Sequence, residues 1–446
     1  MRKTFMLVLT LFMGLSLFLA ACSSEKSSGG SGNDGSEGSS NSGDEGNGDG
    51  GMSEVTLNVT TTFGGTDPGH DAYEKLVSQF EEEHPNVTIK ENNFTAKPAT
   101  TAKFRTSWSG GKVPDVLWYF VGAKGNFLYE SGKTVPMPTI MEANPEWADT
   151  FDQRALEAVK KLAPNGKLHA IPLLGYYEGL IANKALFEKY GLELPKTWEA
   201  FKKAVETFKK NDVIPVTVSM NTPNYLIEHY ILAAGGAKCH SKGLEEGVPE
   251  CYVNGLNLIK ETYEWGAYPE DSLTLPDDVA AQNYYKKGQA AMIFDGSWVV
   301  GGLPEDIAKT TTVLPVPTPP NSSGYDGKQI ISGFSQGWFV SKEAYNSNKK
   351  KAAVAFLKFM TSKEADQALV DVYGSVPAVK GVEVKAGTPA QMAGFDLVEN
   401  ATALEPASDG FLPPKTFAHI RDNIPAIVTG EKTAEGVLKK AKELGY

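Results

Sequence analysis

Serine, histidine and carboxylate residues of this 446-residue chain occur in an order that could support nucleophilic hydrolysis. Residues 333–337 read Gly-Phe-Ser-Gln-Gly, which fits the G-x-S-x-G pattern of a serine nucleophile. Asp366 or Asp409, followed by His419, would complete a set in the Ser–Asp–His order that one class of hydrolases uses. Such a serine is followed directly by a helix, whereas residues 338–340 read Trp-Phe-Val, which is typical of a strand. The pattern therefore disfavours a hydrolase of this kind.

A second kind of catalytic site would use paired carboxyl groups. A glycosidase needs two of them roughly 5–10 Å apart. Asp115 and Glu178 could approach one another between two lobes, but nothing in the sequence indicates a perturbed acid. The chain also has no H-E-x-x-H motif, P-loop or zinc-finger spacing. We therefore expect a protein that is not an enzyme and needs no cofactor.

The elements that would position these residues alternate between strand and helix. Residues 55–60 alternate apolar and polar side chains, as a half-buried strand does. Tyr73, Leu76, Val77 and Phe80 fall on one face of a helix, and Pro85 ends it. The chain repeats this alternation in a series of further segments. It predicts strands at 87–89, 113–118 and 213–218 and amphipathic helices at 198–208 and 352–360. Alternation over about 390 residues indicates an α/β fold with helices on both faces of the sheets.

Length and charge limit the class of protein further. At about 100–200 residues per domain, the chain should form two or three domains or one bilobed unit. It carries 43 Lys and Arg against 54 Asp and Glu, a net charge of −11. Binding to nucleic acid needs a basic face, so this balance argues against such a partner.

The N-terminal residues read as an export signal followed by a tether. Arg2 and Lys3 precede an apolar run over residues 5–19, and Leu-Ala-Ala-Cys ends at Cys22. The tetrapeptide resembles the bacterial lipobox, so we expect residues 1–21 to be a lipoprotein signal peptide and Cys22 to be lipidated. An ordinary signal peptide with an incidental Cys22 is the alternative. Residues 22–52 are rich in Gly, Ser and acidic residues and should form a flexible tether.

Two further cysteines lie twelve residues apart in a polar segment containing Gly and Pro. Outside the cytoplasm, Cys239 and Cys251 are expected to form a disulfide rather than a metal site. His240 raises the alternative of a zinc site, but three ligands without a fourth make it a weak one. We therefore expect a disulfide and no metal.

Short motifs in a fixed order along the body indicate its family. They read FEEEHPNV at 80–87, GGKVPDV at 110–116, GKLHAIP at 166–172, LIANK at 180–184, LFEKYGL at 186–192, PKTW at 195–198, AAGG at 233–236, KGQAAM at 287–292 and DGSW at 295–298. In these motifs the chain from about residue 53 to 446 resembles the family 1 extracellular solute-binding proteins of ABC importers, the maltose-binding-protein-like receptors that mostly bind carbohydrate. Each motif is weak alone, and their shared order and spacing carry the likeness.

The resemblance implies a two-lobed, periplasmic-binding-protein-like fold of type II, with a hinge and the ligand between the lobes. The expected first lobe is 53–174 plus about 312–365, and the second is about 175–311 plus 366–446. The protein would capture a sugar and deliver it, as a monomer, to permease subunits from the outer face of the bacterial cell membrane. A lipoprotein that senses a ligand for a signalling receptor would use the same site and is the alternative.

A sugar site needs flat aromatic faces beside groups that donate and accept hydrogen bonds. By the resemblance, Trp298 in the DGSW motif and Tyr225 ahead of the Gly-Gly turn are the first choices. The remaining expected contacts are Trp118, Tyr119, Tyr176, Tyr177, Glu178, Trp338, Phe417, Asp115, Gly64 and Asp67. Core packing is the alternative for the aromatic residues, capping of its own turn for Asp115, and a simple turn for Gly64 and Asp67.

The same positions indicate the charge and size of the ligand. No arginine occupies them, and an amino acid or an inorganic anion would call for an arginine clamp or a helix terminus. This favours a neutral ligand. Several aromatic faces suggest several sugar rings, and therefore an oligosaccharide.

Overall fold

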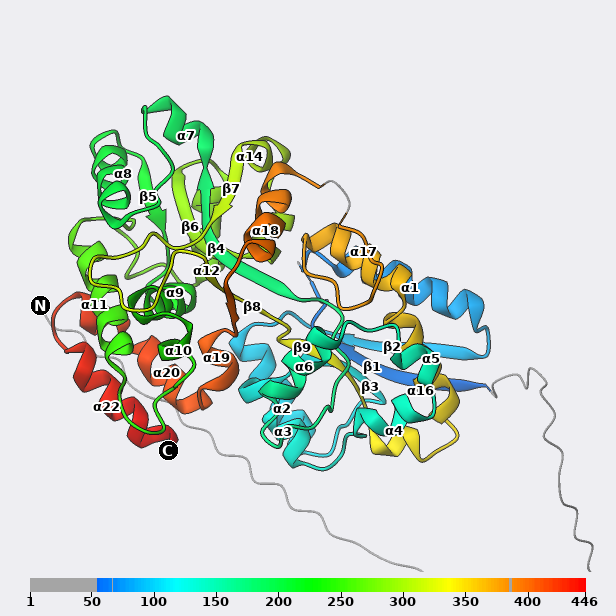
Figure 1. Cartoon of the computed structure of the whole chain (residues 1–446). Helices are drawn as coiled ribbons and strands as arrows, with labels where there is room; N and C mark the ends of the chain where they lie inside the picture. The colour runs from blue at the N-terminus through cyan, green and yellow to red at the C-terminus, as the bar shows by residue number, and fades with distance from the viewer. Residues whose placement is uncertain (1–53, 66, 385–386) are drawn as a thin grey trace, which may run out of the picture. The chain divides into compact units, whose positions relative to one another are not determined.

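A computed structural model describes residues 54–65, 67–384 and 387–446 (Figure 1). The expected signal peptide, the lipidated Cys22 and the tether lie outside the described residues. The described chain contains two β-sheets, each enclosed by helices, and it therefore has the expected two-lobed α/β architecture. Among the described residues, no helix is both long and apolar enough to span a membrane.

The first lobe is built on a four-stranded sheet of order β2-β1-β3-β9. Its elements are β1 (Val55–Thr61), α1 (His70–Glu83), β2 (Val87–Asn93), α2 (Pro98–Ser109), β3 (Val116–Phe120), the 3-10 helix η1 (Gly122–Lys124), α3 (Asn126–Glu130), α4 (Met137–Glu142), α5 (Pro145–Ala148), α6 (Gln153–Leu162), β9 (Gln336–Val340), α15 (Lys342–Tyr345), α16 (Lys350–Met360) and α17 (Lys363–Tyr373). Strands β1, β2 and β3 run parallel, and β9 pairs antiparallel with β3. Figure 1 shows α1, α16 and α17 beside this sheet.

The apolar pattern of the sequence forms the core of the first lobe. On α1 the buried residues are Tyr73, Leu76, Val77 and Phe80, which are the side chains that the helical spacing placed on one face. They pack with Phe356 of α16 in one hydrophobic core, where the Phe80 and Phe356 rings are 5.0 Å apart. Because the three parallel strands end at the same edge, the loops after β1, β2 and β3 come together there.

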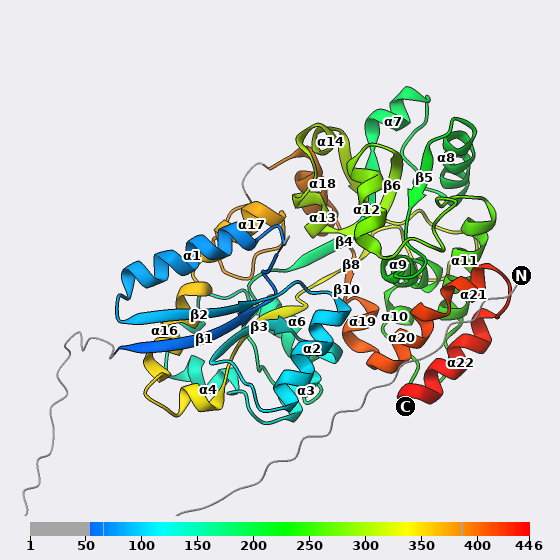
Figure 2. The ribbon, with the colours of Figure 1, turned by 180° about the vertical axis from the view of Figure 1, so that it is seen from behind.

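The second lobe is built on a sheet of order β10-β8-β4-β6-β5, with β7 also paired to β4. Its elements are β4 (Tyr176–Asn183), α7 (Lys184–Lys189), α8 (Trp198–Lys210), β5 (Ile214–Thr217), α9 (Asn224–Gly235), α10 (Ala237–His240), α11 (Glu250–Glu264), α12 (Asp278–Lys286), β6 (Ala290–Gly296), α13 (Ser297–Gly301), α14 (Glu305–Thr310), β7 (Thr311–Leu314), β8 (Gln329–Gly333), α18 (Pro389–Glu399), β10 (Ala403–Glu405), α19 (Ser408–Phe411), α20 (Pro414–Asp422), α21 (Ile424–Val428) and α22 (Ala434–Gly445). Figure 2 shows the C-terminal helices α21 and α22 beside α11.

The chain passes between the lobes at segments that lie side by side. Within the described residues it does so near 174–176, near 333–336 and between α17 and α18. The first two segments pair as Tyr176 with Gly333, and the amide of Gly175 donates to the carbonyl of Val376 at 2.7 Å. A group of adjoining crossings is the arrangement that hinge motion requires.

The observed lobe boundaries differ from the expected ones at two places. The return to the first lobe was expected near residue 312, but β7 and β8 both pair with β4, so the second sheet continues to Gly333. Residues from 366 onward were expected in the second lobe, but α17 packs in the first core through Leu369 and Tyr373. Both errors arise because strand pairing and helix docking depend on contacts distant in sequence.

Candidate functional site

Three aromatic side chains of the second lobe meet around Trp298. Trp298 lies on α13, directly after β6, and its ring centroid is 5.6 Å from that of Tyr225 and 6.1 Å from that of Tyr176. Tyr176 opens β4 and Tyr225 lies in the first turn of α9. Trp298 is only partly buried, and it packs against all three hydrophobic cores of the described residues. The sequence therefore brings three expected ligand contacts together at the junction of the lobes.

Two glutamates are buried beside these rings. Glu178 on β4 and Glu228 on α9 are each 2% exposed. The amide of Ser408 donates to Oε2 of Glu228 at 2.7 Å, and Nδ1 of His229 lies 3.9 Å from Oε2 of Glu178. His229 Nδ1 also contacts the carbonyl oxygen of Tyr225 at 2.7 Å, which makes it the protonated nitrogen.

Burial determines the protonation of Glu178, Glu228 and His229. Burial, together with the negative charge of Glu228, raises the pKa of Glu178 well above its usual value. Burial and the charge of Asp409 raise the pKa of Glu228 to about 8, and burial lowers the pKa of His229 to about 4. At neutral pH both carboxyl groups therefore favour their protonated, uncharged forms, and His229 is neutral. The site can both donate and accept hydrogen bonds without a full set of charges.

A further carboxyl group lies at the end of β6. Asp295 is 1% exposed and accepts from the amide of Gly296 at 2.9 Å and from Nε2 of Gln282 at 3.0 Å. Burial and the charge of Asp278 raise its pKa to about 7. Burial raises the pKa of Tyr225 well above its usual value, and the nearby charges of Asp295 and Asp278 raise it further. Tyr225 is thus a neutral hydroxyl beside partly protonated acids.

The two lobes touch next to this site. Nζ of Lys124 on η1 is 2.6 Å from Oδ2 of Asp409 on α19, which joins the first lobe to the second. Gly122, two residues before this lysine, has a φ of 65°, a conformation that favours glycine. A Cβ atom at Gly122 would lie 2.3 Å from the carbonyl oxygen of Gly410, so the backbones approach closely here.

The loop after β1 is fixed by contacts within its own surroundings. A Cβ atom at Gly64 would lie 2.5 Å from the amide nitrogen of Phe94, so this glycine permits a close backbone approach. Asp67 accepts from the amide of Gly69 at 3.0 Å and from the hydroxyl of Tyr373 on α17. Burial raises the pKa of Asp67. These contacts fit the turn that was the alternative for Gly64 and Asp67.

Several expected ligand contacts lie in hydrophobic cores instead. Trp118 and Trp338 are 0% exposed and face each other across β3 and β9, with ring centroids 5.4 Å apart. Three others are also buried. Tyr119 packs against Phe104, Tyr177 packs against α18, and Phe417 lies in the second core. Their side chains fill the space between a sheet and its helices, which fits the core packing that was the alternative for these residues.

Asp115 has a structural role. It accepts from the amide of Asn58 at 2.7 Å and pairs with Nζ of Lys349 at 2.7 Å. It precedes β3, at the edge opposite the carboxyl ends of the parallel strands. These contacts favour the structural role of Asp115 over a ligand contact or a pairing with Glu178.

The serine hydrolase arrangement also lacks its required elements. Ser335 lies between strands β8 and β9, with no helix directly after it. Asp366 is buried in the first core and accepts from the amides of Ala378 and Val379, whereas His419 lies on α20 of the second lobe beside Asn423.

The expected disulfide is present: Cys239 and Cys251 are joined, with Cα atoms 6.2 Å apart.

The sequence argument missed the groups that interact with Glu178. These are Glu228, His229 and Asp409, and Lys124 of the other lobe interacts in turn with Glu228 and Asp409. One signal was present, because Glu228 and His229 are a charged and a polar residue inside the otherwise apolar run of α9. Asp409 was considered only for a hydrolase, since its position here depends on a contact with Lys124 that is 285 residues away in the chain.

Comparison with known proteins agrees with this architecture. The sequence profile of the family described as "Bacterial extracellular solute-binding protein" matches residues 66–367. The multiple sugar-binding protein of Streptococcus mutans serotype c is 24% identical over 347 residues, 71% of this chain and 74% of that protein. The xylose/arabinose-binding protein XacG of Haloferax volcanii is 25% identical over 384 residues, 82% of this chain and 77% of that protein.

Solved structures show the same fold. A chitin oligosaccharide binding protein superposes with a TM-score of 0.76 at 25% identity, over 87% of this chain and 98% of that one. The solute-binding protein RafE in complex with raffinose gives a TM-score of 0.70 at 20% identity, over 87% and 98% of the two chains. With the profile match spanning more than half of its length, this chain belongs to the family of bacterial extracellular solute-binding proteins.

Proposed function

We propose that this protein captures a sugar, in particular an oligosaccharide, between its two lobes and delivers it to the permease of an ABC importer. The observation that carries the proposal is the partly exposed Trp298, flanked by Tyr176 and Tyr225 where the lobes meet. Aromatic rings of this kind stack on the C–H faces of sugar rings. The names of the relatives, which bind multiple sugars or xylose and arabinose, support the same class of ligand.

The buried acids suit a neutral ligand. The raised pKa values of Glu178 and Glu228 favour their uncharged forms at neutral pH, and an uncharged carboxyl group can both donate and accept hydrogen bonds, as sugar hydroxyls require. The Lys124–Asp409 pair fixes the approach of the first lobe. Reversible capture followed by hinge closure needs no bond to be broken, and the protein acts as a binding protein without catalysis.

The proposal includes the attachment of the protein to the membrane. Lipidation of Cys22 would hold a monomer at the outer face of the cell membrane, and residues 23–51 would serve as its tether. Mass spectrometry of protein from membranes tests this: the N-terminal peptide should begin at a diacylated Cys22. Recovery of an unmodified Cys22 in exported protein would contradict it.

Thermal unfolding against mono- and oligosaccharides, amino acids and peptides tests the ligand class. A ligand at 100-fold over its dissociation constant stabilises the native state by about 2.7 kcal/mol, which gives a measurable shift. We expect a shift confined to one series of sugars. A response only to charged ligands would contradict the sugar assignment, and release of product from the glycan would contradict the absence of catalysis.

The role of Trp298 is tested with a matched tryptophan. Trp298→Ala should weaken sugar binding by about 2–4 kcal/mol, the range of an anchor residue. Trp265 is also partly buried and belongs to the same second core, but it packs against Trp198 at 5.3 Å instead of the Tyr176–Tyr225 pair. Trp265→Ala should change stability and leave affinity unaltered. Equal affinities for the two variants would remove Trp298 from the site.

A further inference from the structure

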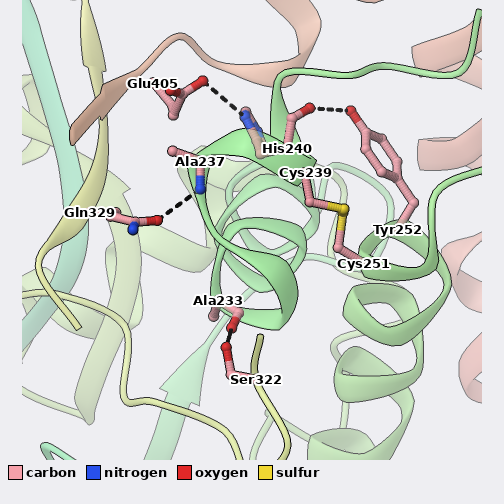
Figure 3. Close-up of a disulfide and its surroundings, with 9 residues drawn as sticks. All are labelled: Ala233, Ala237, Cys239, His240, Cys251, Tyr252, Ser322, Gln329 and Glu405. Atoms are coloured by element: carbon pink, nitrogen blue, oxygen red, sulfur yellow. Dashed lines mark hydrogen bonds and ion pairs between the residues drawn. A yellow bond between two sulfur atoms is a disulfide. The ribbon is translucent and has the colours of Figure 1, made fainter. Parts of the chain in front are cut away.

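The disulfide lies at the end of the helix that carries Tyr225 and Glu228. Helix α9 runs directly into α10, which contains Cys239, and the disulfide joins α10 to Cys251 on α11 (Figure 3). The hydroxyl of Tyr252 donates to the carbonyl of His240 at 2.8 Å, and the amide of Ala237 donates to Oε1 of Gln329 at 2.7 Å. Helix α10 is therefore held by one covalent bond and by polar contacts at both of its ends.

His240, next to Cys239, directs its ring toward another part of the chain. The residue is fully buried, its Nε2 lies 3.0 Å from Oγ of Ser408, and its Nδ1 lies 3.8 Å from Oε2 of Glu405. Figure 3 shows Glu405 and the disulfide on different sides of His240. The ring also packs edge-on against Phe411, with centroids 5.4 Å apart. A disulfide-anchored imidazole thus holds the segment from Glu405 to Phe411.

That segment supplies three polar contacts around the candidate site. The amide of Ala407 donates to the hydroxyl of Tyr176 at 2.9 Å, and the amide of Ser408 donates to Glu228 at 2.7 Å. The next residue, Asp409, forms the 2.6 Å ion pair with Lys124 of the first lobe. A displacement of these three residues would disturb the aromatic group, the acid pair and the contact between the lobes together.

We propose that His240, anchored by the Cys239–Cys251 disulfide, is a positioning residue that fixes Ala407–Asp409 so that the second lobe can engage Lys124. His240 acts through Ser408 and does not touch the ligand. The positioning role is a property of the protein without ligand, and only its effect on sugar affinity rests on the proposed function.

Hydrogen exchange of the ligand-free full chain tests the role directly. His240→Ala should speed exchange about fivefold, the factor for one net hydrogen bond, in two segments: 405–412, and 122–128 of the other lobe. The amides of Gly125 and Leu128 are hydrogen-bonded in the second segment and report on it. His240→Gln, whose side-chain amide can reach the position of Nε2, should restore both segments.

Two controls separate positioning from general loss of stability. His419→Ala changes a half-exposed histidine of the same lobe and should leave both segments unchanged. Helix α8, also in the second lobe, should keep its exchange rate in His240→Ala. Faster exchange at 405–412 without a change at 122–128, or an equal increase in α8, would overturn the proposal.

Removal of the disulfide and measurement of sugar binding test the proposal further. The Cys239→Ala/Cys251→Ala double variant should reproduce the His240→Ala pattern in both segments, and an unchanged 122–128 would show that the disulfide takes no part. With raffinose and maltotriose as probes, His240→Ala should bind about fivefold more weakly than wild type and His240→Gln should bind equally well. If neither sugar nor any other glycan binds the wild type, the proposed function fails, and the exchange result alone decides the positioning role.

Discussion

The close approach of the lobes at Gly122 leads to a prediction with a matched control. Gly122→Ala adds a Cβ atom 2.3 Å from the carbonyl oxygen of Gly410, whereas ordinary contact begins at 3.4 Å. The backbones must therefore separate by about 1 Å, the difference between these distances. Gly132→Ala is the control, because its φ of 64° is nearly the same as the 65° of Gly122 and nothing lies within 4 Å of the added atom.

Both substitutions should lower the free energy of unfolding, but only one of them should also weaken sugar binding. Each places alanine in the left-handed region, which lowers the free energy of unfolding by about 1–2 kcal/mol. Only Gly122→Ala also pushes Asp409 away from Lys124, whose 2.6 Å ion pair is partly exposed. A pair of this kind contributes about 0.5–1 kcal/mol, so loss of it should weaken sugar binding about two- to fivefold.

Urea unfolding and calorimetric titration with the sugar of largest thermal shift measure the two effects. We expect both variants to lose stability and only Gly122→Ala to lose affinity. If the two variants bind the sugar equally well, the contact between Gly122 and Gly410 does not control the approach of the lobes, and the reasoning fails.

Three further predictions follow from described contacts. Lys124→Met should weaken sugar binding about two- to fivefold and reduce its dependence on salt, whereas Lys309→Met, which removes an exposed ion pair within α14, should do neither, as titrations at two salt concentrations would show. Burial raises the pKa of Asp366 to about 8, so its stabilising effect is complete below pH 4 and is lost as the pH rises to about 8. Wild-type stability relative to Asp366→Asn should therefore fall by about 1.4 kcal/mol per pH unit between pH 5 and 7 in urea unfolding, and a constant difference would contradict this. Removal of the disulfide by Cys239→Ala/Cys251→Ala should lower the free energy of unfolding by about 3 kcal/mol, and an unchanged urea midpoint would count against that estimate.

Local sequence patterns predicted the helices of this protein well. The stripe of Trp198, Phe201, Val205 and Phe208 is the buried face of α8, because helical periodicity depends on neighbours within two turns. The two-lobed fold was also predicted, from the order of short motifs, and the solved structures agree with it. The lobe boundary near 312 was wrong, since β8 pairs with strands that are distant in sequence.

The candidate site was predicted only in part, for a related reason. Trp298, Tyr225 and Tyr176 come together, while Trp118 and Trp338, which are similar in type, lie in a core. Residue type gives the same signal for an aromatic residue that stacks on a ligand and one that packs in a core. An aromatic residue packs in a core when its strand position faces a covering helix, and the local sequence does not contain this information.

The antiparallel pairing of β3 with β9 has a consequence for the order of folding. Val116 pairs with Val340, so the edge of β3 stays open until 224 further residues have been made. Until then, an apolar strand of sequence VLWYF presents unpaired backbone groups that invite pairing with another chain. Contacts over such a separation form slowly. Truncation before residue 336 should therefore give aggregation rather than a stable half-molecule.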